Sequence, residues 1–219
     1  MKGTLQTLTA LLFLARAALS SPPNLNNPIY IISNAEVPSL SRGGLSPVGQ
    51  RRANNCLPKL FQNLDIGKII MCPKNKGSDV CFETLPTTQP TADALGLPID
   101  TSCGADEKTS DNCVQNLVKN FAKTSTQAIL IVWDQGEVGT LLEDKLDLNT
   151  GPADAIDGVH FDVFTVVHKG VISQVTSQNC TGIDGIAAGT DANSPSAAAL
   201  AKSKSKSKKK EKRALHRRW

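Results

Sequence analysis

Several patterns with well-defined functions are missing from this chain of 219 residues. Its longest apolar run, residues 5–14, has about half the length that a membrane-spanning helix needs. No cysteine spacing matches a zinc site, no glycine-rich loop could cradle a phosphate, and no segment repeats. The sequence therefore favours one domain of ordinary size with its own core, and it predicts neither a metal nor another cofactor.

Basic residues are unevenly distributed. Residues 202–218 contain ten Lys or Arg and one Glu, which is a net charge of +9, whereas the rest of the chain has 14 basic and 19 acidic side chains. The body is therefore mildly acidic, at about −5, although the whole chain carries +4. This distribution argues against a basic face that would bind nucleic acid specifically.

The low-complexity tail, residues 202–219, follows an Ala/Ser/Gly-rich stretch, residues 183–201, which we interpret as a linker. Three interpretations of the tail remain open. It is a solvated, disordered segment, an electrostatic anchor to an anionic polymer or surface, or a nuclear-localisation run. Lys212-Arg213 is also a candidate dibasic processing site.

The N-terminus resembles a secretory signal peptide, which we expect at residues 1–21. Lys2 supplies the positive charge, residues 5–14 form the apolar region, and small residues gather from Ala15 to Ser21. A signal peptide argues against the nuclear interpretation and predicts a secreted protein. It leaves residues 22–182 as the folded domain.

Six cysteines in a secreted chain indicate disulfides, although six thiols allow 15 connectivities. Cys103 and Cys113 flank a short polar loop and form the best local pair, and Cys72 and Cys81 form the next best. Cys56 would then pair with Cys180. The one N-glycosylation sequon is centred on the same cysteine, in Asn179-Cys180-Thr181, so a disulfide there would compete with glycosylation.

Apolar and amphipathic segments alternate along the domain. Strands are predicted at residues 28–33, 66–71, 99–101 and 128–133, and a hairpin at 161–167 and 171–175. Helices are predicted at residues 46–63, 86–95, 111–123 and 136–146. Continuous apolar strands between helices predict an α/β fold, a three-layer sandwich in which helices cover both faces of a mostly parallel sheet. The final hairpin would add an antiparallel edge.

Ligand sites in such sheets lie beyond the C-terminal ends of the strands. Ser33-Asn34, Cys72-Pro73-Lys74 and Asp134-Gln135 all follow predicted strands. The expected topology therefore brings these three segments to one edge of the sheet.

Two neighbouring motifs carry a family resemblance. Residues 29–36 (IYIISNAE) form a buried-strand pattern that ends in a polar turn, and residues 45–53 (LSPVGQRRA) begin a helix at a Ser cap. Together they resemble the opening of the histidine phosphatase (phosphoglycerate mutase-like) superfamily, especially its small secreted fungal members. There the strand ends in Arg-His-Gly or Arg-His-Ala and then Glu, and the helix reads Leu-Ser-x-x-Gly-x-x-Arg/Gln-Ala. The similarity extends in order over residues 28–184, through segments 92–97, 100–103, 129–133, 161–163 and 179–182.

The resemblance implies phosphoryl transfer to a nucleophilic His, with two Arg and a second His holding the phosphate oxygens. In this chain the first Arg position is Ser33, the nucleophile is Asn34, the second Arg falls near Val80, and the second His is Gln135. No Arg lies between Arg52 and Arg213, so no neighbour replaces the second Arg. The domain's two histidines, His160 and His168, lie near the hairpin and are expected at its surface or edge.

Some polar residues remain near the expected pocket. The candidates are Glu36, Arg42, Lys74, Asp134 and Gln135, with Lys76 as a further cation. Glu36 matches the family's Glu and could instead hold the loop through backbone amides, and the cations could simply be solvated. Arg52 belongs to the helix motif and is expected to be structural. Cys81 lacks a His partner and is better explained by a disulfide.

Three functions follow from these observations. The first is a secreted pseudoenzyme that keeps the phosphatase fold and binds an unidentified ligand or protein partner. The second is a weak phosphomonoesterase, or another hydrolase, that uses Glu36, Asp134 and nearby Lys residues. The third is a protein that binds a polyanion or the cell wall through its basic tail.

Overall fold

The computed structural model describes residues 26–39, 43–75, 77, 80–106, 109–148 and 160–184. The expected signal peptide, most of the expected linker, the basic tail, Arg42 and Lys76 lie outside these ranges. Within them, no helix has the length and apolarity needed to cross a membrane.

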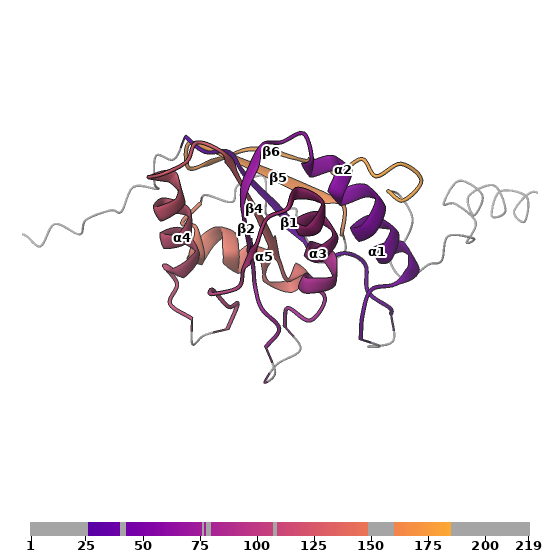
Figure 1. The fold of residues 1–219 in the computed structure, drawn as a ribbon. Helices are drawn as coiled ribbons and strands as arrows, with labels where there is room; N and C mark the ends of the chain where they lie inside the picture. Colours follow the sequence, from indigo (N-terminus) through magenta and orange to yellow (C-terminus); the bar gives the residue numbers. More distant parts are fainter. Residues whose placement is uncertain are drawn as a thin grey trace, which may run out of the picture.

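One six-stranded sheet forms the centre of the domain (Figure 1). Its strands are β1 (Ile29–Ser33), β2 (Ile66–Met71), β3 (Ile99–Asp100), β4 (Ala128–Trp133), β5 (Val163–His168) and β6 (Val171–Ser177). The spatial order is β3-β2-β4-β1-β5-β6. The first four strands in this order run parallel, and β5 and β6 form the antiparallel edge. The predicted three-layer α/β class is confirmed.

Alternate residues of the central strands face opposite layers, which explains their continuous apolar sequences. On β4, Ile129, Ile131 and Trp133 pack toward α4 (Cys113–Ala122) and the helical segment 138–145. Leu130 and Val132 pack on the other side, toward α2 (Leu57–Phe61) and α3 (Thr84–Leu95). Strands with both faces buried have no polar alternation, as parallel sheets require.

The predicted helix at 46–63 is a helical run with a change of pitch in its middle. It consists of α1 (Pro47–Arg51), the π-helix η1 (Arg52–Cys56) and α2. Ser46 caps its start by accepting a hydrogen bond from the amide of Gly49, and Pro47 occupies the first turn, where its missing N–H costs nothing. Further along the chain, Gly96 ends α3 in a left-handed conformation, as its position predicts.

Two helix boundaries differ from expectation. Asp111 does not cap α4, because the helix begins at Cys113 after Asn112, which makes no side-chain cap. The region 136–146 is a succession of three short helices, η2 (Gln135–Glu137), α5 (Val138–Thr140) and η3 (Leu141–Lys145). Asp134 starts this succession, because its carboxylate accepts the amide of Gly136.

Three disulfides join Cys56 to Cys180, Cys72 to Cys81 and Cys103 to Cys113. These are the three predicted pairs.

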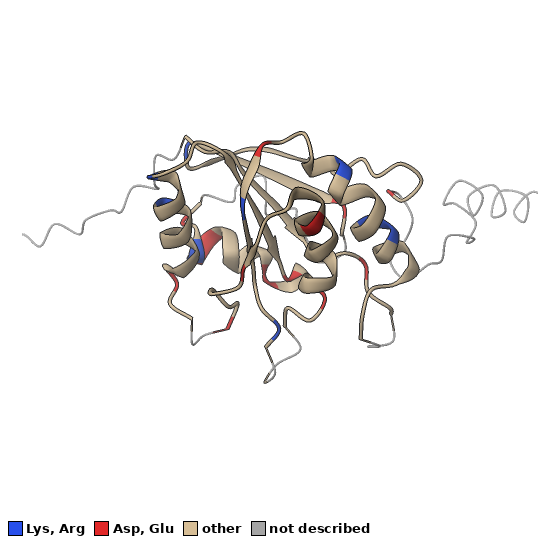
Figure 2. Ribbon diagram, in the orientation of Figure 1, with Lys and Arg blue, Asp and Glu red and all other residues tan. Residues whose placement is uncertain are grey.

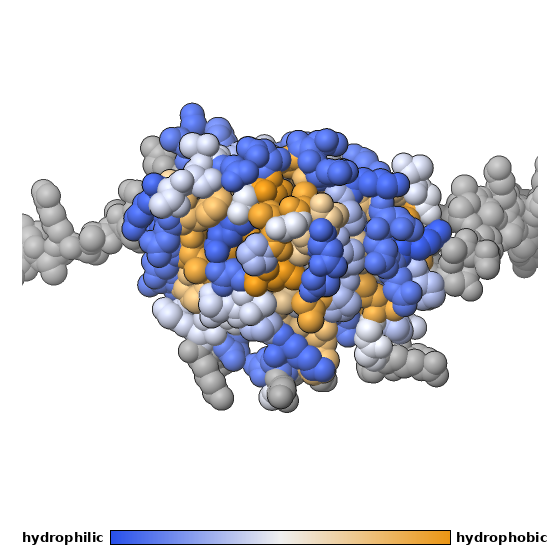
Figure 3. All heavy atoms as spheres, in the orientation of Figure 1, coloured by the Kyte–Doolittle hydropathy of each residue, from blue (hydrophilic) through white to orange (hydrophobic). Residues whose placement is uncertain are grey.

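The surface in Figure 3 is hydrophilic around a hydrophobic area in the middle of that face. Among the described residues, the large hydrophobic side chains that are exposed are Leu85, Val171 and Val175.

Candidate functional site

The C-terminal ends of β1, β4 and β2 meet at one edge of the sheet, as the sequence predicts. Ser33 pairs in register with Trp133, and the amide of Asn34 donates to the Trp133 carbonyl at 2.9 Å. The amide of Cys72 donates to the carbonyl of Val132 at 3.3 Å. The segments that follow the three strands are therefore held side by side.

Asn34 and Gln135, which the sequence resemblance aligns with the family's two histidines, are joined by a hydrogen bond. The backbone amide of Gln135 donates to Oδ1 of Asn34 at 2.8 Å, and Nδ2 of Asn34 donates to the Ala35 carbonyl at 3.1 Å. Asn34 is only 5% exposed. Both ends of its side chain are thus bound to the protein's own backbone.

A small cavity beside this hydrogen bond is lined by Ser33, Gln135, Val138 and His160 among others. Its volume is about 10 Å³, close to the space that a single water molecule needs. Nε2 of Gln135 is buried and has no hydrogen-bond partner among the described residues. The cavity is therefore too small for a phosphate ester, but it has one donor to offer.

His160 lies closer to the strand ends than its sequence position suggests. The residue is exposed overall, as predicted, yet it also lines the cavity with Ser33 and Gln135. His168, at the end of β5, is exposed as predicted. His160 thus lies beside Ser33 and Gln135, and sequence spacing alone could not have placed it there.

Glu36 is buried in an ion pair with Arg52. It is 2% exposed, and its carboxylate accepts three hydrogen bonds from Arg52, at 2.6, 3.0 and 3.1 Å. Arg52 also donates to Gln178 and Asp184, each at 2.8 Å. Burial lowers the pKa of Arg52, but the hydrogen bonds and charges of Glu36 and Asp184 outweigh it and raise that pKa above its ordinary value. The predicted structural role of Arg52 thus fits the geometry, and Glu36 is engaged by the guanidinium rather than by backbone amides.

Ser46, Gly49 and Arg52 of the helix motif share one role, because all three hold the loop after β1. The amide of Ser46 donates to the carbonyl of Glu36 at 2.8 Å. A Cβ on Gly49 would lie 2.2 Å from the same carbonyl oxygen, so only glycine allows the helix to approach this closely. The helix motif therefore positions the loop and does not supply a reacting group.

Residues 183 and 184 contribute to the same network, although the sequence places them at the start of the linker. Ile183 is buried, and Oδ2 of Asp184 accepts from Ser177 at 2.9 Å and from the amide of Cys180 at 2.5 Å. The Cys56–Cys180 disulfide joins this segment to the helical run.

Asn179, the glycosylation candidate, is exposed and has a left-handed backbone conformation. Its glycosylation remains a prediction.

Asp134 also has structural partners. Its Oδ2 accepts the amide of Cys81 at 2.7 Å, and its Oδ1 accepts the amide of Gly136 at 3.0 Å. Thr84 donates a bifurcated hydrogen bond to the carbonyls of Cys72 and Cys81, each at 2.9 Å. Together with the Cys72–Cys81 disulfide, these contacts fix the loop between β2 and α3 against the end of β4.

The described residues bring little positive charge to the expected pocket. Nζ of Lys74 lies 3.8 Å from the centre of the Phe82 ring, a cation–π contact on an exposed side chain. Val80, at the position of the second Arg, is half-buried and packs against the core. Figure 2 shows Lys and Arg scattered among Asp and Glu over the described part of the chain.

A larger cleft of about 680 Å³ opens beside Val80, and sequence reasoning missed it. Its described lining includes four carboxylates and one ammonium, which belong to Asp106, Asp111, Glu137, Asp144 and Lys145. Lys145 is buried, and its Nζ lies 3.9 Å from Asp111. An excess of carboxylates repels a phosphate monoester, so this cleft is poorly suited to bind one. The described residues contain no cluster of three or more side chains suited to a metal ion.

Comparison with known proteins places the fold. No family model and no curated protein matches the sequence. Among solved structures, the protein histidine phosphatase SixA bound to tungstate superposes with a TM-score of 0.50 at 13% identity. The match covers 69% of this chain and 97% of SixA.

Two further structures are similar. A phosphohistidine phosphatase SixA from Agrobacterium tumefaciens has a TM-score of 0.47 at 17% identity, covering 72% of this chain and 99% of its own. A phosphoserine phosphatase from Entamoeba histolytica, bound to phosphoserine, has a TM-score of 0.46 at 13% identity. The match covers 70% of this chain and 98% of that phosphatase. From the similarity to the tungstate complex, this chain has the histidine phosphatase fold, as the sequence motifs imply.

Proposed function

We propose that this protein is a secreted pseudophosphatase, which keeps the histidine phosphatase fold, does not transfer phosphate and binds a ligand or protein partner. The hydrogen bond between Asn34 and the Gln135 amide carries the proposal. It joins Asn34, which the resemblance aligns with the nucleophile, to the backbone of Gln135, which it aligns with the second histidine, and it occupies the side-chain oxygen of Asn34.

The chemistry of the side chains supports the loss of activity. The amide nitrogen of Asn34 has its electron pair delocalised into the carbonyl and cannot accept a phosphoryl group. Ser33, Val80 and Gln135 bring no positive charge to the phosphate oxygens. Each missing charged contact costs about 2–4 kcal/mol in the transition state. Three such losses amount to roughly 6–12 kcal/mol, which reaches the lower part of the range of whole enzymatic rate enhancements, and the missing nucleophile adds to them.

The test is phosphate release from an aryl phosphate, measured from acidic to neutral pH on the mature protein with its disulfides intact. An active histidine phosphatase serves as the positive control. We expect no turnover above the background of a protein-free blank, either from the unmodified chain or from an Asn34→Ala variant. Turnover that co-purifies with the protein and disappears with Asn34→Ala would contradict the proposal.

A second candidate function is a weak hydrolase, and the position of His160 favours it. Glu36 and Asp134 are bound by Arg52 and by backbone amides, so they are poorly placed to act as the acid and base. His160 and Ser33 line the same cavity, and an imidazole is the side chain that most often serves as a general acid or base. Turnover that survives Asn34→Ala and falls about a hundredfold with His160→Ala would establish this function in place of the first.

The basic tail is the reason to retain a third function, binding to an anionic polymer or surface. A segment of net charge +9 is attached to a body of about −5, so electrostatic attraction to a polyanion would come from the tail. Affinity for heparin should fall steeply with salt and should disappear when residues 202–219 are deleted. Affinity that survives the deletion would place polyanion binding on the body.

A further inference from the structure

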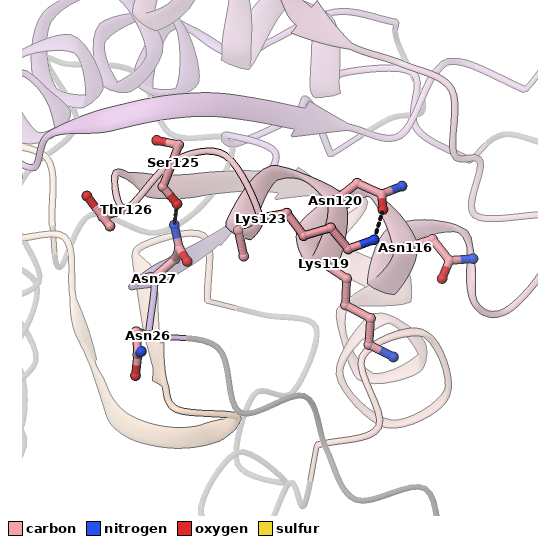
Figure 4. Close-up of a pocket in the computed structure, with 9 residues that line it drawn as sticks. Asn26, Asn27, Asn116, Lys119, Asn120, Lys123, Ser125 and Thr126 are labelled. Atoms are coloured by element: carbon pink, nitrogen blue, oxygen red, sulfur yellow. Dashed lines mark hydrogen bonds between the residues drawn. The ribbon is translucent and has the colours of Figure 1, made fainter.

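A second groove lies at the opposite edge of the sheet from the strand ends discussed above. It forms where β1 and β4 begin and where α4 ends, and its volume is about 430 Å³ (Figure 4). Nine residues line it: Asn26, Asn27, Asn116, Lys119, Asn120, Ala122, Lys123, Ser125 and Thr126. Four are asparagines and two are lysines, and this described lining contains neither a carboxylate nor an aromatic ring.

Asn27 gives the groove a fixed inner wall. It is 4% exposed, and its Nδ2 donates to the carbonyls of Ser125 and Gln127 at 2.9 and 2.8 Å. These two bonds use both amide hydrogens, while Oδ1 accepts no hydrogen bond from a described residue. A buried side chain therefore presents a free, oriented acceptor.

The outer walls carry further polar side chains, most of which are exposed to solvent. Figure 4 shows Asn26 and Asn27 on one side of the groove and Asn116, Lys119 and Asn120 on the other. The side chains of Asn26, Asn116 and Thr126 make no hydrogen bond to any described residue. Each amide offers a donor and an acceptor, which is the pattern that binds pairs of hydroxyl groups.

The two ammonium groups are held in place on the polar face of α4. Nζ of Lys119 donates to Gln115 at 2.7 Å, and Nζ of Lys123 donates to Asn120 at 3.0 Å. Each ammonium keeps two more N–H donors. Lysines near the end of a helix also offset its negative pole, a structural role that needs no ligand. That role does not explain the amides on the facing segment.

We propose that this groove binds an anionic saccharide, whose hydroxyl groups pair with the asparagine amides and whose acidic group pairs with Lys119 and Lys123. The volume is within the range of small-molecule sites. Since the lining has no aromatic ring for stacking, a neutral sugar would lack both an apolar platform and the charged contact. The proposal is independent of the catalytic positions.

The test is an NMR titration of the full mature chain with trigalacturonate at physiological salt, with maltotriose as the neutral comparison. We expect saturable shifts of the groove amides with trigalacturonate only. Lys119→Gln with Lys123→Gln should weaken binding at least about tenfold, because charge-assisted hydrogen bonds are lost. Asn116→Ala should weaken it by a smaller factor, because one amide is lost.

A matched control removes the same charge elsewhere. Lys59→Gln with Lys169→Gln changes two exposed lysines outside the groove and leaves the tail intact, so it should bind as the unmodified chain does. Three results would overturn the proposal: no saturable binding, equal binding of maltotriose, or equal weakening in the control pair. The last result would assign the affinity to net charge or to the tail.

Discussion

Gly49 shows how one missing side chain permits a long-range contact. A Cβ at this position would lie 2.2 Å from the carbonyl oxygen of Glu36. The atoms nearest to this Cβ all belong to the backbone of Glu36, so they cannot rotate away as a side chain could. We expect Gly49→Ala to destabilise the protein by about 1–3 kcal/mol, measured by chemical denaturation.

Gly139→Ala is the matched control for this substitution. Gly139 lies in α5, and nothing would contact its Cβ within 4 Å, so alanine should be neutral or stabilise by about 0.5–1 kcal/mol through helix propensity. If both substitutions cost the same, the close approach of the helix to the loop would not explain Gly49.

Arg52 and its neighbour Arg51 allow a comparison of two arginines on one helical run. Arg52 is paired and buried, whereas Nε and Nη2 of Arg51 are buried with no hydrogen-bond partner among the described residues. Arg52→Met should cost about 3–5 kcal/mol, because it leaves Glu36 buried and unpaired. Arg51→Met should be close to neutral.

The double variant Glu36→Gln with Arg52→Met measures the coupling energy between these two side chains. It should cost clearly less than the sum of the two single changes, since Glu36 no longer leaves a buried unpaired carboxylate, while Asp184 loses its cation equally in Arg52→Met alone. Additive costs, measured in the same unfolding experiments, would show that Glu36 and Arg52 do not stabilise one another.

Elements were predicted best where a local pattern determines them. The apolar runs of β1, β2 and β4 fixed these strands to within one residue, and the hairpin turn at Lys169-Gly170 was found from its sequence. The π-helix at Arg52–Cys56 was not predicted, and its first residue contacts Glu36 and Gln178, which are distant in sequence. Local periodicity carries no information on such contacts.

Strands β2 and β3 are joined by an ion pair whose effect depends on pH. Nζ of Lys68 lies 2.7 Å from Oδ2 of Asp100. Burial raises the pKa of Asp100, but hydrogen bonds from Lys68 and Ser102 and the charge of Lys68 outweigh it, and the pKa is lowered. The resulting stabilisation is full above the carboxyl's unfolded pKa, and it is lost as the pH falls through the lowered folded pKa.

Asp100→Asn should therefore reduce the pH dependence of unfolding in the acid range. The pair is partly exposed, so the loss at neutral pH should stay below about 1 kcal/mol. Lys68→Met is the matched control, because it removes the cation and keeps the carboxyl group, and it should reproduce part of the effect. An unchanged acid slope in both variants would contradict a role for this pair.

Across the whole molecule, the disulfides differ in the length of chain that they close. Cys56 and Cys180 are 124 residues apart, and Cys103 and Cys113 are 10 apart. By loop-closure entropy, removing the first pair by Cys→Ala changes should cost about 2 kcal/mol more than removing the second. Thermal and denaturant unfolding of the two double variants measures this difference. A larger loss for Cys103 and Cys113 would mean that packing outweighs chain entropy.

The overall architecture was predictable from the order of elements, whereas the state of the candidate site was not. Asn34 and Gln135 were each placed at a strand end, yet the hydrogen bond between them spans 101 residues of sequence. The groove at the other sheet edge was missed because Asn26, Asn116 and Thr126 follow no motif. Only the assembled sheet and α4 bring these residues together.

The network around Arg52 also sets an order of events during synthesis. Arg52 and Cys56 emerge early, but their partners Gln178, Cys180 and Asp184 come more than a hundred residues later. At about 5–20 residues per second, the helical run waits on the order of ten seconds for the contacts that anchor it. Until then Cys56 is an unpaired thiol while four other cysteines emerge, so correct pairing of this chain depends on its last described segment.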